Sequence, residues 1–250
     1  MLRRPYRALA VCSAWVFACT LVQSEEPRPL HAIEKAVVLL SHTEPKADYA
    51  IGSGFMVGAD GRILTANHVI IDEKSGHPHE RLFAIHFTGD QHRFFRVTVA
   101  HRCQNGSQGR DLTLLRPVAS PDLALPHLQI GSIPEVGAEV LLAGFPLVFD
   151  KFYPFPLVRR GSVASSRFTF EGDPVLVLDL AAVFGFSGSP VVDLKTGKAI
   201  AVFIGSPSER TNTNFSVAAV IQPTDVEAEK QESQPGKITK VEAVPKEHAR

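Results

Sequence analysis

Residues 52–69 read GSGFMVGADGRILTANHV, in which a turn separates two short apolar runs. The runs, Gly52–Val57 and Ile63–Thr65, are too short for ordinary helices and have the bulky or β-branched residues that strands favour. Between them stands Asp60-Gly61, a dipeptide that suits the left-handed backbone of a tight hairpin turn. The stretch therefore predicts a β-hairpin that is followed at once by His68.

Short apolar or alternating runs, broken by turn residues, continue along the rest of the chain. The 250 residues include 18 glycines and 18 prolines, which suits many short strands better than long helices. Residues 31–41 are expected to form a short helix or turn that leads into a first strand, and residues 117–127 hold three prolines and form a connector. The strands fall into two sets, which predicts two barrels or a sandwich. The further expected strands are 52–57, 63–65, 82–87, 94–100, 112–116, 139–143, 157–165, 175–180, 190–193, 199–204 and 215–221.

Three polar residues, His68, Asp111 and Ser187, offer the chemistry of a hydrolytic site. Hydrolysis of an amide needs a nucleophile, a base that takes its proton, and a group that orients the base. A neutral histidine accepts the serine proton and later donates it to the leaving group. A carboxylate beside the histidine fixes its tautomer and stabilises the imidazolium ion that forms. We therefore expect these three residues to be catalytic.

The segments around these residues resemble the motifs of trypsin-like serine peptidases. Residues 65–68 (Thr-Ala-Asn-His) are similar to the histidine motif of that family, and residues 111–115 (Asp-Leu-Thr-Leu-Leu) to its aspartate strand. Residues 185–190 (Gly-Phe-Ser-Gly-Ser-Pro) are similar to its serine loop. The order His, Asp, Ser is that of the chymotrypsin type, whereas α/β-hydrolases and subtilisins have other orders. Any one of these motifs is weak, but three in this order are specific.

Within that family, the bacterial HtrA/Deg-like branch is the nearest in sequence pattern. Residues 52–65 resemble its histidine region, and residues 136–146 and 160–165 resemble the opening segment and a later strand of its second barrel. The resemblance covers about residues 31–222. The PDZ domain that is usual in HtrA proteins has no counterpart after residue 222, so control by a PDZ domain is not expected.

This resemblance implies an all-β fold of two antiparallel Greek-key β-barrels with the active site between them. Residues 25–120 would form the N-terminal barrel, which carries His68 and Asp111. Residues 121–223 would form the C-terminal barrel, which carries Ser187.

The serine loop departs from the family pattern at two positions. Phe186 stands where the family has asparagine, aspartate or a similar residue, and Ser189 stands where it has a second glycine. Gly185 and Gly188 remain, so the resemblance still implies an oxyanion hole whose donors are the N–H groups of Gly185 and Ser187.

The resemblance also implies where the side chain before the scissile bond would bind. The family position six residues before the serine is Ala181, which carries no charge, so a preference for Arg or Lys is not expected. With Phe203, Ile204 and Gly205, it would form an apolar pocket for a small or medium apolar side chain. The alternative is that the protein's own side chains fill this pocket.

The first 24 residues have the features of a secretory signal peptide. Arg3, Arg4 and Arg7 precede the apolar run Ala8–Val22, which is too short to span a bilayer comfortably. The chain is therefore expected to be exported to a periplasm or secreted, with no membrane span after cleavage near Glu25. An uncleaved leader, or lipidation at Cys19, are the alternatives. After cleavage Cys103 is the one remaining cysteine, so no internal disulfide could form.

The C-terminal residues 224–250 are rich in Glu, Lys and Gln, which predicts a solvated, disordered tail. The formal net charge of the chain is zero, which gives no reason to expect nucleic acid as a partner. His77, His79 and Glu80 lack a fourth ligand, so we expect a solvated loop there and neither a metal nor a cofactor.

Together these features predict an exported serine endopeptidase that acts on proteins or peptides through an acyl-enzyme. The alternative is a weak or inactive module of the same fold that binds peptides or proteins, because Phe186 and Ser189 could distort the serine loop. A weaker alternative is an esterase or acyltransferase, since the same three residues serve those reactions.

Overall fold

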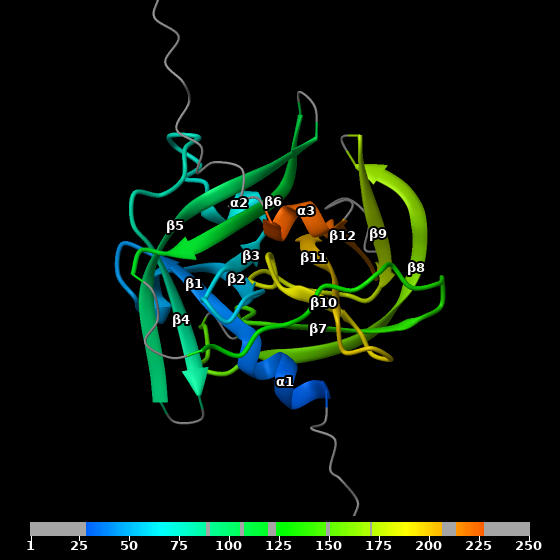
Figure 1. The fold of residues 1–250 in the computed structure, drawn as a ribbon, viewed down its shortest axis with the longest axis horizontal. Helices are drawn as coiled ribbons and strands as arrows, with labels where there is room; N and C mark the ends of the chain where they lie inside the picture. The colour runs from blue at the N-terminus through cyan, green and yellow to red at the C-terminus, as the bar shows by residue number, and fades with distance from the viewer. Residues whose placement is uncertain are drawn as a thin grey trace, which may run out of the picture.

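The computed structural model describes residues 29–88, 91–105, 108–119, 124–148, 151–170, 172–206 and 214–227, which form two β-barrels that lie side by side (Figure 1). The first barrel closes in the order β1-β2-β3-β6-β5-β4, and every neighbouring pair is antiparallel. Its strands are β1 (Val37–His42), β2 (Ala50–Met56), β3 (Ile63–Thr65), β4 (Leu82–Thr88), β5 (Gln91–Asn105) and β6 (Gln108–Pro117).

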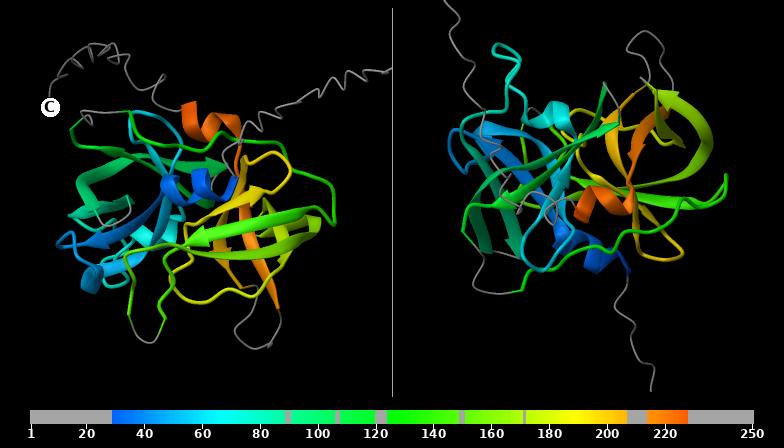
Figure 2. Two further views of the ribbon diagram at one scale, coloured as in Figure 1. Left: turned by 90° about the horizontal axis from the view of Figure 1, so that it is seen from below. Right: turned by 45° about the horizontal axis from the view of Figure 1, so that its top comes forward.

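The second barrel closes in the order β10-β11-β12-β9-β8-β7, again antiparallel throughout. Figure 2 shows, from two further sides, that it packs against the first barrel along one flank. Its strands are β7 (Glu139–Gly144), β8 (Leu157–Phe170), β9 (Asp173–Asp179), β10 (Pro190–Asp193), β11 (Ala199–Gly205) and β12 (Phe215–Val220).

The predicted fold class, all-β with two antiparallel barrels, is confirmed. The hairpin at Asp60-Gly61 is present: β2 pairs with β3, and Gly61 has a φ of 82°, which a residue with a side chain adopts reluctantly. Strands β5 and β8 are longer than their apolar runs, because their ends stay paired with neighbouring strands in hairpins, β5 with β4 and β6, and β8 with β9. The predicted boundary between the barrels, at residues 120 and 121, lies outside the described residues.

Helices are short and lie at the ends of strands. They are α1 (Pro29–Ala36), the 3₁₀ turn η1 (Ala47–Tyr49), α2 (Asn67–Ile70) and α3 (Pro223–Glu227). Helix α1 buries Ile33 and Ala36 and runs directly into β1, as residues 31–41 predicted. Among the described residues, no helix is both long and apolar enough to cross a lipid bilayer.

A continuous apolar interface joins the two barrels. Leu141, Ala143 and Phe145 of the second barrel belong to the same buried cluster as the core of the first. The ring of Phe145 lies 5.4 Å from that of Phe87 in β4. Burial of this apolar area stabilises one relative placement of the barrels, which matters because the predicted site draws residues from both.

Helix α3 corrects the prediction that a solvated tail starts at Thr224. Asp225 in this helix is buried, and both its carboxylate oxygens accept hydrogen bonds from Arg110 Nη1 in β6, at 2.7 and 3.0 Å. The Arg110 Nη2 group also donates to the carbonyl of Val220, and Arg62 donates to the carbonyl of Val226. These long-range partners order residues 224–227, whose composition alone indicated solvent exposure. Residues 1–28, with the predicted signal peptide, and residues 228–250 lie outside the described part of the chain.

The thiol of Cys103 is expected to resist alkylation in the folded protein. Its side chain is buried, and burial raises the pKa of the Cys103 thiol far above its usual range, with the nearby Asp225 carboxylate raising it further. Because the thiolate is the reactive form, residues 25–250 should show no reactive thiol towards Ellman's reagent until they unfold. As a control, the protein unfolded in guanidinium chloride should react with the reagent at one thiol per chain. Rapid reaction without denaturant would contradict the burial of Cys103.

Candidate active site

His68 and Asp111 are brought together by the pairing of two strands. Thr65 in β3 lies opposite Thr113 in β6, and the strands are antiparallel. Three residues after Thr65 the chain reaches His68, and two residues before Thr113 it reaches Asp111, so both leave the pair at the same end. Helix α2 then turns His68 towards β6.

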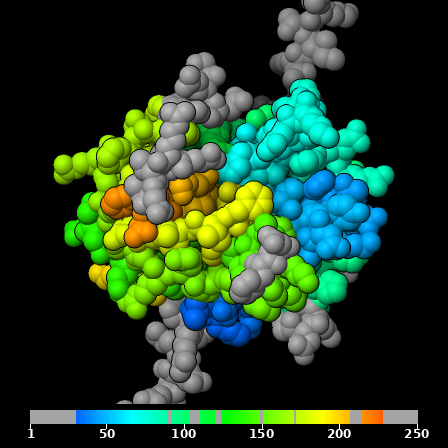
Figure 3. Space-filling view, turned by 180° about the vertical axis from the view of Figure 1, so that it is seen from behind, coloured from blue at the N-terminus to red at the C-terminus, as the bar shows by residue number. Residues whose placement is uncertain are grey.

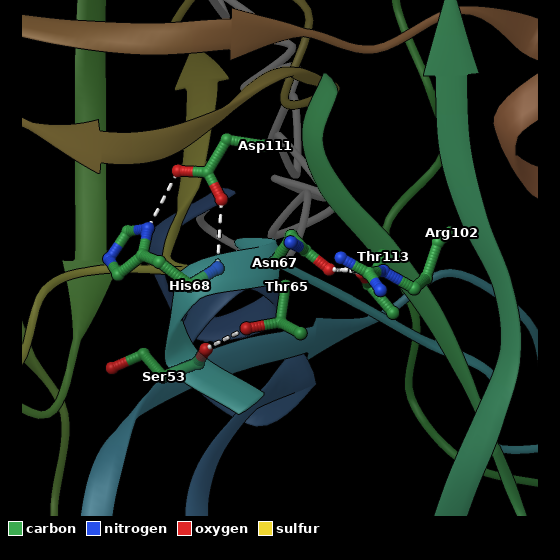
Figure 4. A network of polar contacts seen from close by, with 7 residues as sticks. All are labelled: Ser53, Thr65, Asn67, His68, Arg102, Asp111 and Thr113. Atoms are coloured by element: carbon green, nitrogen blue, oxygen red, sulfur yellow. Dashed lines mark hydrogen bonds and ion pairs between the residues drawn. The ribbon is translucent and has the colours of Figure 1, made fainter. Parts of the chain in front are cut away.

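The contact between His68 and Asp111 is a double one (Figure 4). Asp111 Oδ2 lies 2.6 Å from His68 Nδ1, and Asp111 Oδ1 accepts a hydrogen bond of 2.8 Å from the His68 backbone N–H. A carboxylate only accepts, so the neutral ring carries its proton on Nδ1 and has Nε2 free to act as a base. The His68 side chain is 46% exposed and that of Asp111 26%, so the base is open to solvent and substrate.

A second polar contact anchors the turn that carries His68. The side-chain oxygen of Asn67 accepts hydrogen bonds from Arg102 Nε, at 2.8 Å, and from Thr113 Oγ1, at 3.0 Å. Thr113 lies two residues from Asp111 on β6, so Asn67 ties the histidine turn to the aspartate strand (Figure 4). This role of Asn67 was not predicted from the sequence, where its only signal is a polar side chain directly before the histidine.

Ser187 lies in the loop between β9 and β10. Figure 3 shows yellow segments of the second barrel at the surface beside blue and cyan segments of the first. Gly185 and Gly188 flank it with φ angles of 95° and 85°, which a residue with a side chain would adopt only with strain. The Gly188 N–H donates to the carbonyl of Phe203, at 2.8 Å, which ties the loop to β11. The Ser187 side chain is half-buried.

The unusual Phe186 is an apolar anchor for this loop. Its side chain is 1% exposed, lies in the core of the second barrel, and packs edge-to-face on Phe203 with the ring centres 6.5 Å apart. Burying a phenylalanine stabilises a fold by about 1.5–3 kcal/mol. The aromatic residue therefore holds the loop in place by packing, where the family has a polar residue.

The loop faces the histidine turn across Gly52. A Cβ atom at this glycine would lie 2.9 Å from Cγ1 of Val69, the neighbour of His68, and 3.1 Å from the carbonyl oxygen of Ser187. Among the described residues, no hydrogen bond joins Ser187 Oγ to His68. In unliganded hydrolases such contacts are often long and tighten when substrate binds.

Residues 52–202 match the sequence pattern of the trypsin-like peptidase domain. The chain belongs to the trypsin-like peptidase family. Among curated proteins, the mitochondrial serine protease HTRA2 of Drosophila ananassae is 31% identical over 153 residues, which is 60% of this chain and 33% of that protein. The HTRA2 protein of Drosophila pseudoobscura pseudoobscura is 31% identical over 155 residues, with the same coverage. The chain thus spans about a third of these relatives.

Solved structures agree on the fold. The protease domain of MamO from Magnetospirillum magneticum superposes with a TM-score of 0.60 at 20% identity, over 80% of this chain and 98% of that one. A serine endoprotease from Yersinia pestis superposes with a TM-score of 0.58 at 20% identity, over 81% of this chain and 63% of that one. Family membership and the shared fold together identify a trypsin-like peptidase domain.

Phe203 does not line an open pocket in this trypsin-like chain, contrary to the expectation from sequence. Side chains alternate along β11, so Phe203 points with Ala201 into the core of the second barrel, where it is 3% exposed and packs on Phe186. Ala181, Ile204 and Gly205 are partly exposed. A surface cavity of about 870 Å³ lies elsewhere, lined by residues 130–139, 193–196 and 198.

The remaining candidate groups are His77, His79 and Glu80, for which no metal was expected. In the described ranges, no three His, Cys, Asp or Glu side chains gather closely enough to hold a metal ion. His79 instead stacks on His42, with ring centres 4.6 Å apart, and burial lowers the pKa of His79.

Proposed function

We propose that this chain is an exported serine endopeptidase in which Ser187 is the nucleophile, His68 the general base and acid, and Asp111 the group that orients His68. The observation that carries the proposal is the pair of contacts between Asp111 and His68, which leave His68 Nε2 as the free base. The flexible-backbone glycines beside Ser187 and the family membership support the nucleophile.

The proposed reaction has two halves. Ser187 Oγ attacks the carbonyl carbon of the scissile peptide while His68 Nε2 takes the hydroxyl proton. His68 then gives that proton to the leaving amine, which departs and leaves an acyl-enzyme. Water, activated by the same nitrogen, attacks the acyl carbon and releases the acid and free Ser187.

The proposed oxyanion donors are the backbone N–H groups of Gly185 and Ser187. Neither N–H donates a hydrogen bond to any residue in the described part of the chain. Two such donors aimed at the developing negative charge would stabilise the tetrahedral intermediate.

For specificity, we retain a preference for a small or medium apolar side chain before the scissile bond. Ala181 and Ile204 are apolar and partly exposed near the serine loop, and Phe203 fills the space behind them. Export rests on the signal-like residues 1–24 alone.

The test is labelling with a fluorophosphonate, which reacts only with an activated serine. Residues 25–250 should label, and the variants Ser187→Ala and His68→Ala should not. The rates at which unlabelled wild-type protein hydrolyses casein and a small p-nitrophenyl ester then distinguish a peptidase from an esterase.

The second candidate is a binding module of the same fold. It is favoured by one observation, that Ser187 Oγ and His68 share no hydrogen bond in the described residues. Wild-type protein that fails to label under any condition, while folded, would favour this module and contradict the endopeptidase.

A further inference from the structure

Ser53 makes four hydrogen bonds from one fully buried position in β2. Its N–H donates to the carbonyl of Ser187, at 2.9 Å, and its hydroxyl donates to the carbonyl of Gly185, at 2.8 Å. The same hydroxyl oxygen accepts from the N–H of Phe145, at 2.9 Å, and the Ser53 carbonyl accepts from Thr65 Oγ1, at 2.7 Å. All its polar groups are therefore used, in a residue that is 0% exposed.

Three of these bonds cross from the first barrel to the second. They end on Gly185 and Ser187, the two residues of the serine loop whose N–H groups are the proposed oxyanion donors, and on Phe145, which follows β7. The hydroxyl spans 132 positions of sequence to reach Gly185.

Glycines on the facing segments make room for this contact. A Cβ atom at Gly188 would lie 2.0 Å from the Ser53 carbonyl oxygen, and one at Gly144 would lie 2.9 Å from Ser53 Oγ. Both are closer than real atoms approach, so the second barrel accommodates Ser53 through the absence of side chains.

The serine loop needs an external anchor because of its own backbone. Gly185, with a φ of 95°, has no Cβ to restrict its rotation, so several orientations of its peptide groups are accessible. A hydrogen bond to the Gly185 carbonyl fixes the peptide plane that follows this residue. A bond to the Ser187 carbonyl fixes the plane that follows the nucleophile.

We propose that Ser53 is a positioning residue that holds the oxyanion loop, through Gly185 and Ser187, in the orientation that catalysis requires. The inference rests on the proposed function for its catalytic consequence. Ser53 contacts no substrate; it acts by restricting the backbone of residues that do. Only the assembled barrels bring this hydroxyl, from a strand near the histidine, to the loop of the nucleophile.

The test replaces Ser53 with alanine and compares it with Ser41→Ala. Ser41 is also fully buried and donates one hydrogen bond to a backbone carbonyl, that of Glu44, but touches no part of the serine loop. On a peptide p-nitroanilide with alanine before the scissile bond, Ser53→Ala should lower kcat by about 10²-fold, since small misplacements of a catalytic group have effects of this size. KM should change little, and Ser41→Ala should keep wild-type kcat. Each variant is assayed well below its own melting temperature.

Two further measurements separate positioning from loss of stability. Ser53→Cys, nearly isosteric but a weak donor, should recover part of kcat. Hydrogen exchange of the amides at residues 181–189 should be about tenfold faster in Ser53→Ala than in wild type, and unchanged in Ser41→Ala. Wild-type kcat together with unchanged exchange in Ser53→Ala would overturn the inference.

The same experiment keeps the two proposals apart. Wild-type protein that neither labels nor hydrolyses would overturn the proposed function, and hydrogen exchange would then still decide whether Ser53 holds the loop. Labelled wild type with unaffected Ser53→Ala would overturn the positioning role and leave the proposed function intact.

Discussion

Replacing Ser187 with alanine is expected to lower kcat for peptide hydrolysis by about 10⁶-fold, because no other group can form the acyl-enzyme. The matched control is Ser189→Ala, two residues further on. The Ser189 hydroxyl is buried and has no hydrogen-bond partner among the described residues, so its removal should leave kcat within a few-fold of wild type. Progress curves on a peptide p-nitroanilide check both values, with protein concentration taken from absorbance and active sites counted by fluorophosphonate in the wild type and in Ser189→Ala only. Substantial turnover by Ser187→Ala would contradict the nucleophile.

A substitution at Asp111 is expected to lower kcat by less than the substitution at Ser187. Asp111→Asn should lower kcat by about 10⁴-fold, because an amide nitrogen can favour the wrong tautomer of His68. The asparagine side chain has nearly the same size as that of aspartate, so the melting temperature should change little while kcat falls. A loss of less than tenfold would contradict the role of Asp111 as the orienting group, even if Ser187 proved essential.

Replacing Asp225 with alanine is expected to destabilise the fold by about 3–5 kcal/mol, since it leaves the buried charge of Arg110 without its partner. The Arg110 and Asp225 side chains are only 4% and 5% exposed. The carboxylate also accepts the N–H of Gln222, at 2.7 Å, so several groups lose their partner at once. Urea unfolding, followed by fluorescence or circular dichroism, measures the change.

The control for this prediction is the ion pair of Asp60 and Arg62, whose side chains are 55% and 25% exposed. Loss of such a surface pair costs about 0–1 kcal/mol. Asp60→Ala should therefore shift the urea midpoint much less than Asp225→Ala. The double variant Arg110→Met with Asp225→Leu should recover most of the lost stability, because apolar residues of similar volume need no ionic partner. Equal shifts of the urea midpoint in Asp60→Ala and Asp225→Ala would contradict the claim that burial makes the Arg110–Asp225 pair the more important one for stability.

Much of the fold follows from local sequence patterns. Short alternating runs and glycine turns, such as Asp60-Gly61, act within a few residues, so they predicted the strands and the hairpin of β2 and β3. The same holds for the candidate site residues His68, Asp111 and Ser187, which were recognised from short motifs in a fixed order. The lengths of β5 and β8 were underestimated, because pairing with β4, β6 and β9 extends these strands beyond their apolar runs.

Contacts between distant residues could not be predicted in this way. Phe203 was expected to line a pocket, but alternation along β11 and the ring of Phe186 place it in the core. Ser53 lies between two glycines in the sequence, and its bonds to Gly185 and Ser187 exist only because the two barrels pack together.

The amino-acid sequence was enough for the strands, because hydrophobic period and turn chemistry are properties of adjacent residues. The resemblance of short motifs to those of trypsin-like peptidases supplied the choice of two barrels over a sandwich and the catalytic candidates. The three-dimensional packing alone assigned Phe186 as an anchor, ordered α3 through Arg110 and Asp225, and joined Ser53 to the serine loop. Each of the last two depends on a hydrogen bond between groups more than a hundred residues apart, whose partners no local pattern specifies.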